Sequence, residues 1–278
     1  MTNKTAKFPS KCDQTTFVKR VVMDNAVHFL KRLAHLNSDG TPPQWVVELQ
    51  PFRYVLDVLN NMTNVRSAIN QCRSLANQAA APPPSSWLDT IDLTTMSFRQ
   101  QVLDLFTVVL HSTLDRMLLL TNVVHVLGMT PRNCTLKQVQ SALSHKNEAL
   151  LKALDRLKSA IDPLTDARHS YVHRGEHRRL ELFTDLVHLR TILESFKVPI
   201  ENVVLNEEDA DENLLSALRV DMLSVDSAAA GSLEALLDPY ESQVEQLGGI
   251  QRPTGVEAQR AVQVIAYFGG GKRPDFMG

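Results

Sequence analysis

The stretch that decides the fold of this 278-residue chain is residues 102–120, which read VLDLFTVVLHSTLDRMLLL. Its apolar residues recur every three or four positions, which is the spacing of one face of an α-helix. Because that face is wide, we expect a long helix at the centre of the fold, with Gly128 and Pro131 marking its end. The face consists of Val102, Leu105, Phe106, Val109, Leu110, Leu114, Met117 and Leu118.

Helical spacing also covers most of the rest of the chain, and no run alternates between apolar and polar residues for long enough to predict a buried strand. The sequence therefore predicts an all-α protein. The expected helices cover about residues 13–36, 45–75, 102–128, 135–161 and 166–198, with shorter ones at 213–225, 233–247 and 256–268.

Five residues predict where helices begin, end or bend. Thr135 has the side chain of an N-cap, and so does Asp166. Asp162 with Pro163 predicts a helix end or a kink between those two caps, because proline lacks the N–H of a mid-helix hydrogen bond. By the same reasoning, Pro51 predicts that the helix at 45–75 is kinked or restarted there.

A proline run, AAAPPPSS at residues 79–86, favours an extended connector and is the best candidate boundary in the chain. We expect N-terminal helices in residues 1–77, a proline-rich linker at 78–86, a helical core at 87–200, and acidic C-terminal helices with a tail at 201–278. A short linker permits residues 1–77 to form a separate domain or to pack onto the same bundle.

Composition excludes several classes of protein. With 44% hydrophobic and 22% charged residues, the chain is not intrinsically disordered as a whole. The three cysteines, Cys12, Cys72 and Cys134, are far apart and include no C-x2-C pair, which argues against a disulfide framework and a thiolate metal site. We expect a cytoplasmic protein with neither a secretion signal nor a membrane span.

The charges are distributed unevenly along the chain. Residues 1–200 hold 24 Lys and Arg against 17 Asp and Glu, whereas residues 201–245 hold 12 acidic residues and the single base Arg219. One interpretation is a basic surface that meets a polyanion, shielded by the acidic segment. The other is a solvated acidic helix face, and the sequence leaves both open.

One segment is polar where its neighbours are apolar, and it carries the densest group of functional side chains. Residues 166–176 read DARHSYVHRGE. Four of the nine histidines fall within twenty residues here, mixed with five arginines. They are His169, His173, His177 and His188, and Arg168, Arg174, Arg178, Arg179 and Arg190.

This segment resembles the motif of the HEPN family (higher eukaryotes and prokaryotes nucleotide-binding), an arginine, a polar residue, a short spacer and a histidine. Arg168 and His173 give R-x4-H, and His169 is the polar residue after the arginine. The resemblance covers roughly residues 90–200 and implies a HEPN-like helical bundle with additional N- and C-terminal helices. In that family, two copies of the motif meet across a homodimer interface to form a metal-independent endoribonuclease.

The chemistry of such a reaction needs these residue types. A group that titrates near neutral pH must take the proton of the RNA 2′-hydroxyl as that oxygen attacks the phosphorus, and we assign this role to His173. A guanidinium suits the negative charge that develops on the phosphate oxygens, and we assign this role to Arg168. Side chains expected to help bind the substrate are His169, Tyr171, Arg174 and Arg178.

The two catalytic candidates do not share a face of an ideal helix. At about 100° per residue, Arg168 and His173 point roughly 140° apart. A helix irregularity at Gly175 would narrow this angle, and a second subunit would supply the missing partner. The homodimer that the resemblance implies would likewise bring an arginine and a histidine together at one site.

Other interpretations of the segment are a zinc site and a solvated basic helix face without chemistry. His169, His173 and His177 are spaced i, i+4, i+8, yet three histidines along one face cannot all reach one tetrahedral ion easily, so we predict no metal and no cofactor. The sequence contains no P-loop, G-x-S-x-G or H-E-x2-H pattern, which disfavours the corresponding hydrolases.

The leading hypothesis is a homodimeric endoribonuclease whose partner is RNA. The resemblance also implies an alternative, because some HEPN proteins bind nucleotides or proteins without cleaving, and some pair with nucleotidyltransferase-like partners in toxin–antitoxin modules. In that alternative the chain is a non-catalytic binding module or scaffold that recognises partners through residues 1–77 and 201–245.

Overall fold

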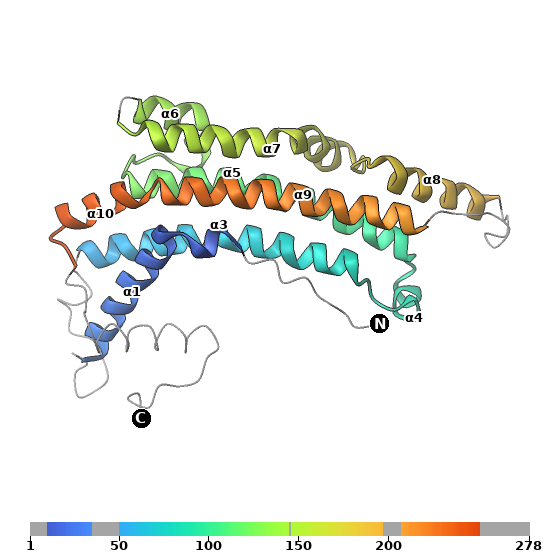
Figure 1. Cartoon of the computed structure of the whole chain (residues 1–278), viewed down its shortest axis with the longest axis horizontal. Coiled ribbons are helices and arrows are strands. Elements are labelled where there is room, and N and C mark those ends of the chain that lie inside the picture. Colours follow the sequence, from blue (N-terminus) through green and yellow to red (C-terminus); the bar gives the residue numbers. More distant parts are fainter. Residues whose placement is uncertain (1–9, 35–49, 145, 197–206, 251–278) are drawn as a thin grey trace. The chain divides into compact units, whose positions relative to one another are not determined.

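A computed structural model describes residues 10–34, 50–144, 146–196 and 207–250, and these residues form helices and connecting turns without a strand (Figure 1). The all-α prediction is confirmed. The helices are α1 (Thr16–Ala34), α3 (Gln50–Ala80), α4 (Ser85–Leu88), α5 (Thr95–Val124), α6 (Leu136–Leu143), α7 (Glu148–Arg174), α8 (Glu181–Ser195), α9 (Glu207–Glu234) and α10 (Leu237–Gln246), with 3-10 turns η1 (Cys12–Gln14), η2 (Asp89–Ile91) and η3 (Pro131–Asn133).

Several predicted boundaries agree with the structure. The long apolar helix is α5, and Gly128 follows it with a positive φ of 69°. Thr135 is the N-cap of α6, where its side chain accepts a hydrogen bond from the Gln138 N–H. Pro51 lies in the first turn of α3, a position that proline tolerates, whereas residues 45–49 lie outside the described residues.

The structure corrects the prediction that a new helix starts at Asp166, because α7 continues through Pro163 to Arg174. Pro163 has no N–H to donate to the carbonyl of Ser159, four residues earlier. Both residues are exposed, so this carbonyl can bond to water instead. Ile161 and Leu164 are buried on either side and keep the helix against the core. Apolar burial therefore outweighs the missing hydrogen bond.

The C-terminal helices also differ from the prediction. Helix α9 is one element of 28 residues, without the predicted break between residues 225 and 233. The run Ala228–Ala230 explains the continuity, since alanine is the best helix former and offsets Gly231. Helix α10 matches the predicted helix at 233–247 in part, and the helix predicted at 256–268 lies outside the described residues.

The chain divides into two compact units, and the long helices each contribute a segment to both. Within the described residues, the first unit contains residues 10, 67–114, 154–196 and 207–228, and the second contains residues 11–34, 50–66, 115–144, 146–153 and 229–250. The boundaries predicted for the segments 1–77, 78–86, 87–200 and 201–278 stay predictions.

The first unit is built around the N-terminal half of α5. Arg99 of α5 donates to the Ala79 carbonyl of α3 at 3.1 Å and forms an ion pair with Asp211 of α9. The core side chains are fully or almost fully buried. They include Ile69, Cys72, Leu103, Phe106, Leu110, Leu157, Ile161, Phe183, Leu214, Leu218 and Val225.

The second unit centres on Tyr240 of α10, which is completely buried. Its ring lies 5.8 Å from that of Phe17 and 5.9 Å from that of Tyr54, measured between centroids. Its hydroxyl donates to the buried Asp24 carboxylate at 2.9 Å, so the polar end of the side chain is satisfied. These contacts fix α10 to α1 and α3.

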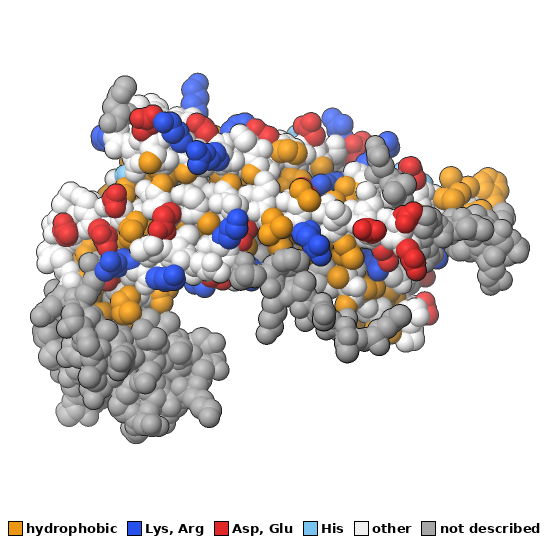
Figure 2. Space-filling model, in the orientation of Figure 1, with side chains coloured by type: hydrophobic (Ala, Val, Ile, Leu, Met, Phe, Trp, Pro, Cys, Tyr) orange, Lys and Arg blue, Asp and Glu red, His pale blue; other side chains and the backbone are white. Residues whose placement is uncertain are grey.

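The acidic segment 201–245 forms ion pairs with arginines from earlier in the chain. In the first unit Asp221 lies 2.8 Å from Arg178, in addition to the Arg99 pair. In the second unit Glu241 pairs with Arg20 at 2.9 Å. Acidic and basic side chains are interspersed on the face drawn in Figure 2. The uneven charge along the sequence is therefore partly neutralised by folding.

No helix in the described part of the chain is long and apolar enough to cross a membrane.

Candidate functional site

The histidine- and arginine-rich segment occupies the last two turns of α7 and the connection to α8, and its last two members, His188 and Arg190, lie on α8 (Figure 1). Helix α7 ends because Gly175 adopts a left-handed conformation, with φ of 69°. The Gly175 N–H donates to the Tyr171 carbonyl at 3.0 Å, which is a standard C-terminal cap. Arg168, His169, Tyr171, His173 and Arg174 all lie on the helix before this cap, and Arg178 lies after it.

Two of the predicted residues form a ring contact on the surface of α7. His169 and His173 are both exposed, and their ring centroids lie 4.6 Å apart. Their spacing of four residues explains the contact, since residues i and i+4 are neighbours on a helix. His173 therefore presents an accessible imidazole near the end of α7.

Arg168 lies elsewhere on the same helix. It is half-buried, and within the described residues it forms no ion pair. Because α7 is continuous from Arg168 to His173 and Gly175 follows both, the roughly 140° between them persists. A single chain does not bring the two side chains to one face.

The remaining substrate-binding candidates have different surroundings. Tyr171 is half-buried, with its ring centroid 6.2 Å from that of His177. Arg174 is exposed and lies 3.9 Å from the Glu176 carboxylate. Arg178 is held in place by its neighbours, and its side chain is only 13% exposed.

His177 leaves the helix instead of continuing the histidine row. It lies beyond the Gly175 cap, and its Nδ1 is 2.5 Å from Oδ2 of Asp104 on α5. His169, His173 and His177 therefore do not line one helix face, which corrects the geometry assumed for a zinc site. Within the residues that the structure describes, no three His, Cys, Asp or Glu side chains are grouped as metal ligands would be.

Asp104 is a residue of the candidate site that the sequence patterns did not single out. Its side chain has no exposed surface, although it lies in the most apolar helix. Oδ1 accepts hydrogen bonds from the Arg178 N–H at 2.9 Å and from Nε2 of Gln100 at 3.2 Å. One signal in the sequence could have identified Asp104, because it is a lone acidic residue within an apolar stretch. A carboxylate that is buried there requires hydrogen-bond partners.

Arg178 fastens the connection between α7 and α8. Besides its backbone bond to Asp104, its guanidinium donates to the Thr107 hydroxyl at 3.3 Å and pairs with Asp221. Its carbonyl accepts from Gln100 at 3.2 Å. This network fixes the position of the neighbouring His177 relative to α5.

An open groove of about 490 Å³ lies over this network. Its volume is in the range of small-molecule sites. Of the predicted site residues, Arg178 lines the groove, whereas Arg168, His169, Tyr171, His173 and Arg174 do not. The lining residues are Asp166, Ala167, Ser170, Gly175, Glu176, His177, Arg178, Arg179, Thr184 and His188.

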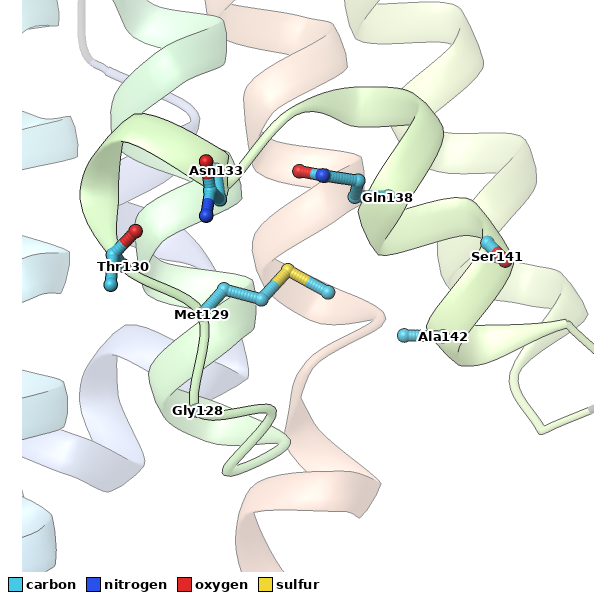
Figure 3. Close-up of a pocket in the computed structure, with 7 residues that line it drawn as sticks. All are labelled: Gly128, Met129, Thr130, Asn133, Gln138, Ser141 and Ala142. Carbon is cyan, nitrogen blue, oxygen red and sulfur yellow. The ribbon is translucent and has the colours of Figure 1, made fainter.

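A second pocket, of about 440 Å³, lies in the other unit between the turn after α5 and helix α6. Figure 3 shows the Met129 side chain extending toward α6, which carries Gln138 and Ser141. Its lining has no ionisable side chain, so it offers no acid or base. The lining residues are Gly128, Met129, Thr130, Asn133, Gln138, Ser141 and Ala142.

Comparison with known proteins gives one match. Residues 54–224, more than half of the chain, match the sequence model of the Cthe2314-like HEPN family. This range includes α5, α7 and α8, and so the whole of the groove. No curated protein and no solved structure matches the chain.

Proposed function

The chain belongs to the HEPN family, and from this premise we propose that it is an endoribonuclease that acts as a homodimer without a metal ion. The observation that carries the proposal is the R-x4-H pair. Arg168 and His173 lie on the last two turns of a family-matched helix, with His173 exposed to solvent.

In the proposed reaction, His173 removes the proton from a ribose 2′-hydroxyl. The 2′-oxygen attacks the adjacent phosphorus, the bond from phosphorus to the 5′-oxygen breaks, and the products carry a 2′,3′-cyclic phosphate and a 5′-hydroxyl. The imidazole of His173 suits this role, because it is exposed to solvent and therefore accessible to a substrate.

Arg168 stabilises the negative charge that develops on the phosphate oxygens. Within the described residues it has no ion pair that would compete for its guanidinium. A guanidinium also presents a planar fork of donors that matches two phosphate oxygens. His169, Tyr171, Arg174 and Arg178 are proposed to contribute to substrate binding.

Two subunits are proposed to form each site. Because Arg168 and His173 point roughly 140° apart on α7, one phosphate reaches both side chains only if they come from different copies of the chain.

We further propose a cytoplasmic location, consistent with three buried cysteines that form no disulfide, and a nucleotidyltransferase-like or other protein partner that regulates the enzyme.

A second candidate function, a non-catalytic protein-binding module, is favoured by the apolar face of α8. Leu189 and Ile192 are 39% and 53% exposed, and Phe196, directly after the helix, is 76% exposed. Their spacing places all three on one side, and a row of exposed apolar side chains is typical of a protein contact.

Cleavage of RNA in the presence of excess chelator separates the two candidates. We expect the wild-type protein to leave 2′,3′-cyclic phosphate ends, and His173→Ala or Arg168→Ala to reduce the rate at least about 100-fold. Arg156→Ala is the matched control, because Arg156 is exposed on the same helix, well before the motif. A folded wild-type protein that cleaves no RNA would favour the binding module.

A further inference from the structure

Cleavage by a 2′-hydroxyl requires two proton transfers, and the proposed function assigns only one of them. A base removes the proton from the 2′-oxygen, and an acid must supply a proton to the 5′-oxygen as its bond to phosphorus breaks. The leaving alkoxide is otherwise a poor leaving group. The acid should be a titratable side chain with a fixed orientation near His173.

We propose that His177, oriented by the buried Asp104, donates this second proton. This inference rests on the proposed ribonuclease function. In the full reaction, His173 gains the proton of the 2′-hydroxyl and His177 gives a proton to the 5′-oxygen. The protein takes up one proton and releases one, so the reaction balances in charge and in electrons. Asp104 does not touch the substrate and is a positioning residue.

The hydrogen bonds of Asp104 determine which nitrogen of His177 faces the groove. Oδ1 of Asp104 accepts two N–H donors, and Oδ2 lies 2.5 Å from Nδ1 of His177. An ionised carboxylate can only accept, so Nδ1 carries the hydrogen of this bond. Nε2 is then the nitrogen available to a ligand, and the imidazole side chain is 56% exposed.

The groove that His177 lines also reaches the turn of α7 that carries the proposed base. His177 and Ser170 both line it, and His173 follows Ser170 by three residues on α7. Residues separated by three are neighbours on a helix, so His173 lies one turn from a lining residue, although it does not itself line the groove. Arg179 lines it as well and is exposed, which places a cation where a phosphodiester would lie.

A purely structural role for His177 is the main competing explanation. The connection after α7 is already fastened by Arg178, through its backbone bond to Asp104 and its ion pair with Asp221. The imidazole is therefore not needed to hold the segment, and more than half of its side chain surface remains accessible. Burial of a purely structural side chain would be more complete.

The decisive experiment compares His177→Asn with wild type on two RNA substrates. Asparagine keeps an N–H that can bond to Asp104 but transfers no proton. The first substrate is an ordinary RNA oligonucleotide, and the second carries sulfur in place of the bridging 5′-oxygen. A thiolate leaves without being protonated, so its departure needs no acid.

We expect His177→Asn to slow cleavage of the ordinary RNA by about 10² to 10⁴-fold and to cleave the sulfur-containing RNA at close to the wild-type rate. Asp104→Asn should show a smaller loss with the same rescue. His173→Ala should be slow on both substrates, because the base is still required. His111→Asn, a matched control on α5, should behave as wild type on both.

The possible failures are distinguishable. If His177→Asn cleaves ordinary RNA at the wild-type rate, or is slowed equally on both substrates, His177 is not the acid and the proposed ribonuclease function still stands. If the wild-type protein cleaves neither substrate, the proposed function and this inference are both overturned.

Discussion

Replacing Asp104 by alanine should destabilise the protein by about 3 kcal/mol. The side chain accepts three hydrogen bonds, at 2.5 Å from His177, 2.9 Å from Arg178 and 3.2 Å from Gln100. Bonds to a charged group contribute about 1.5 to 3 kcal/mol each. The bonds from Arg178 and Gln100, taken at the lower end of this range, together give about 3 kcal/mol, and the exposure of His177 makes its bond a small addition. Loss of the carboxylate also leaves the Arg178 N–H without its acceptor.

Urea unfolding followed by circular dichroism measures this effect. With a slope of about 3 kcal/mol per molar urea, the midpoint should fall by about 1 M. Hydrogen exchange of the Arg178 amide should become faster, since its acceptor is gone. Asp115→Ala is the control: Asp115 is exposed on the same helix, and its loss should change stability by less than about 0.5 kcal/mol. Equal midpoints for Asp104→Ala and wild type would refute the role of the buried carboxylate.

Three further predictions concern stability and reactivity. Gly175→Ala should lower the free energy of unfolding by about 1 kcal/mol, because the φ of Gly175 is positive. Gly231→Ala, inside α9, should raise it by up to about 1 kcal/mol. Urea midpoints of the two variants that shift in the same direction would contradict this. Burial and the charge of Lys146 lower the pKa of His125, so the unfolded chain binds a proton below about pH 6.5 that the folded chain does not. The free energy of unfolding should therefore fall as the pH decreases from 7.5 to 5.5, less so in His125→Gln, and an equal fall in both proteins would exclude His125 as a cause. Burial and the charge of Asp115 raise the pKa of the Cys134 thiol, so an aromatic disulfide reagent should modify it slowly in the folded protein and rapidly in urea; fast modification before unfolding would show that the thiol is accessible.

Local sequence signals predicted part of the fold, although the single helix expected at 135–161 is divided between α6 and α7. The apolar spacing of residues 102–120 found α5, and Thr135 caps α6 as expected, because both depend on residues within one or two turns. Pro163 led to a wrong helix boundary. The hydrogen bond that this proline removes can be inferred from the local sequence, whereas the burial of Ile161 and Leu164 that outweighs the loss depends on contacts with other helices. The unexpected length of α9 has a local reason instead, the alanine run Ala228–Ala230, which the apolar spacing did not reveal.

The candidate site was only partly predictable. Arg168 and His173 were proposed from their spacing, and both lie on α7; their catalytic roles stay predictions. The bond between His177 and Asp104 joins residues 73 positions apart, and no local pattern announces it. The spacing of the histidines predicted that His177 continues the helix of His169 and His173, but that helix ends at Gly175.

The most direct test of a shared ribonuclease site is to mix two inactive variants. Arg168→Ala and His173→Ala each lack one half of the proposed site, but a mixed dimer contains one site with both wild-type residues. Co-refolding them in equal amounts should restore about a quarter of the wild-type RNA cleavage in excess chelator, since half of the dimers are mixed and each has one intact site of two. A mixture as inactive as the separate variants would contradict a site built from Arg168 of one subunit and His173 of the other.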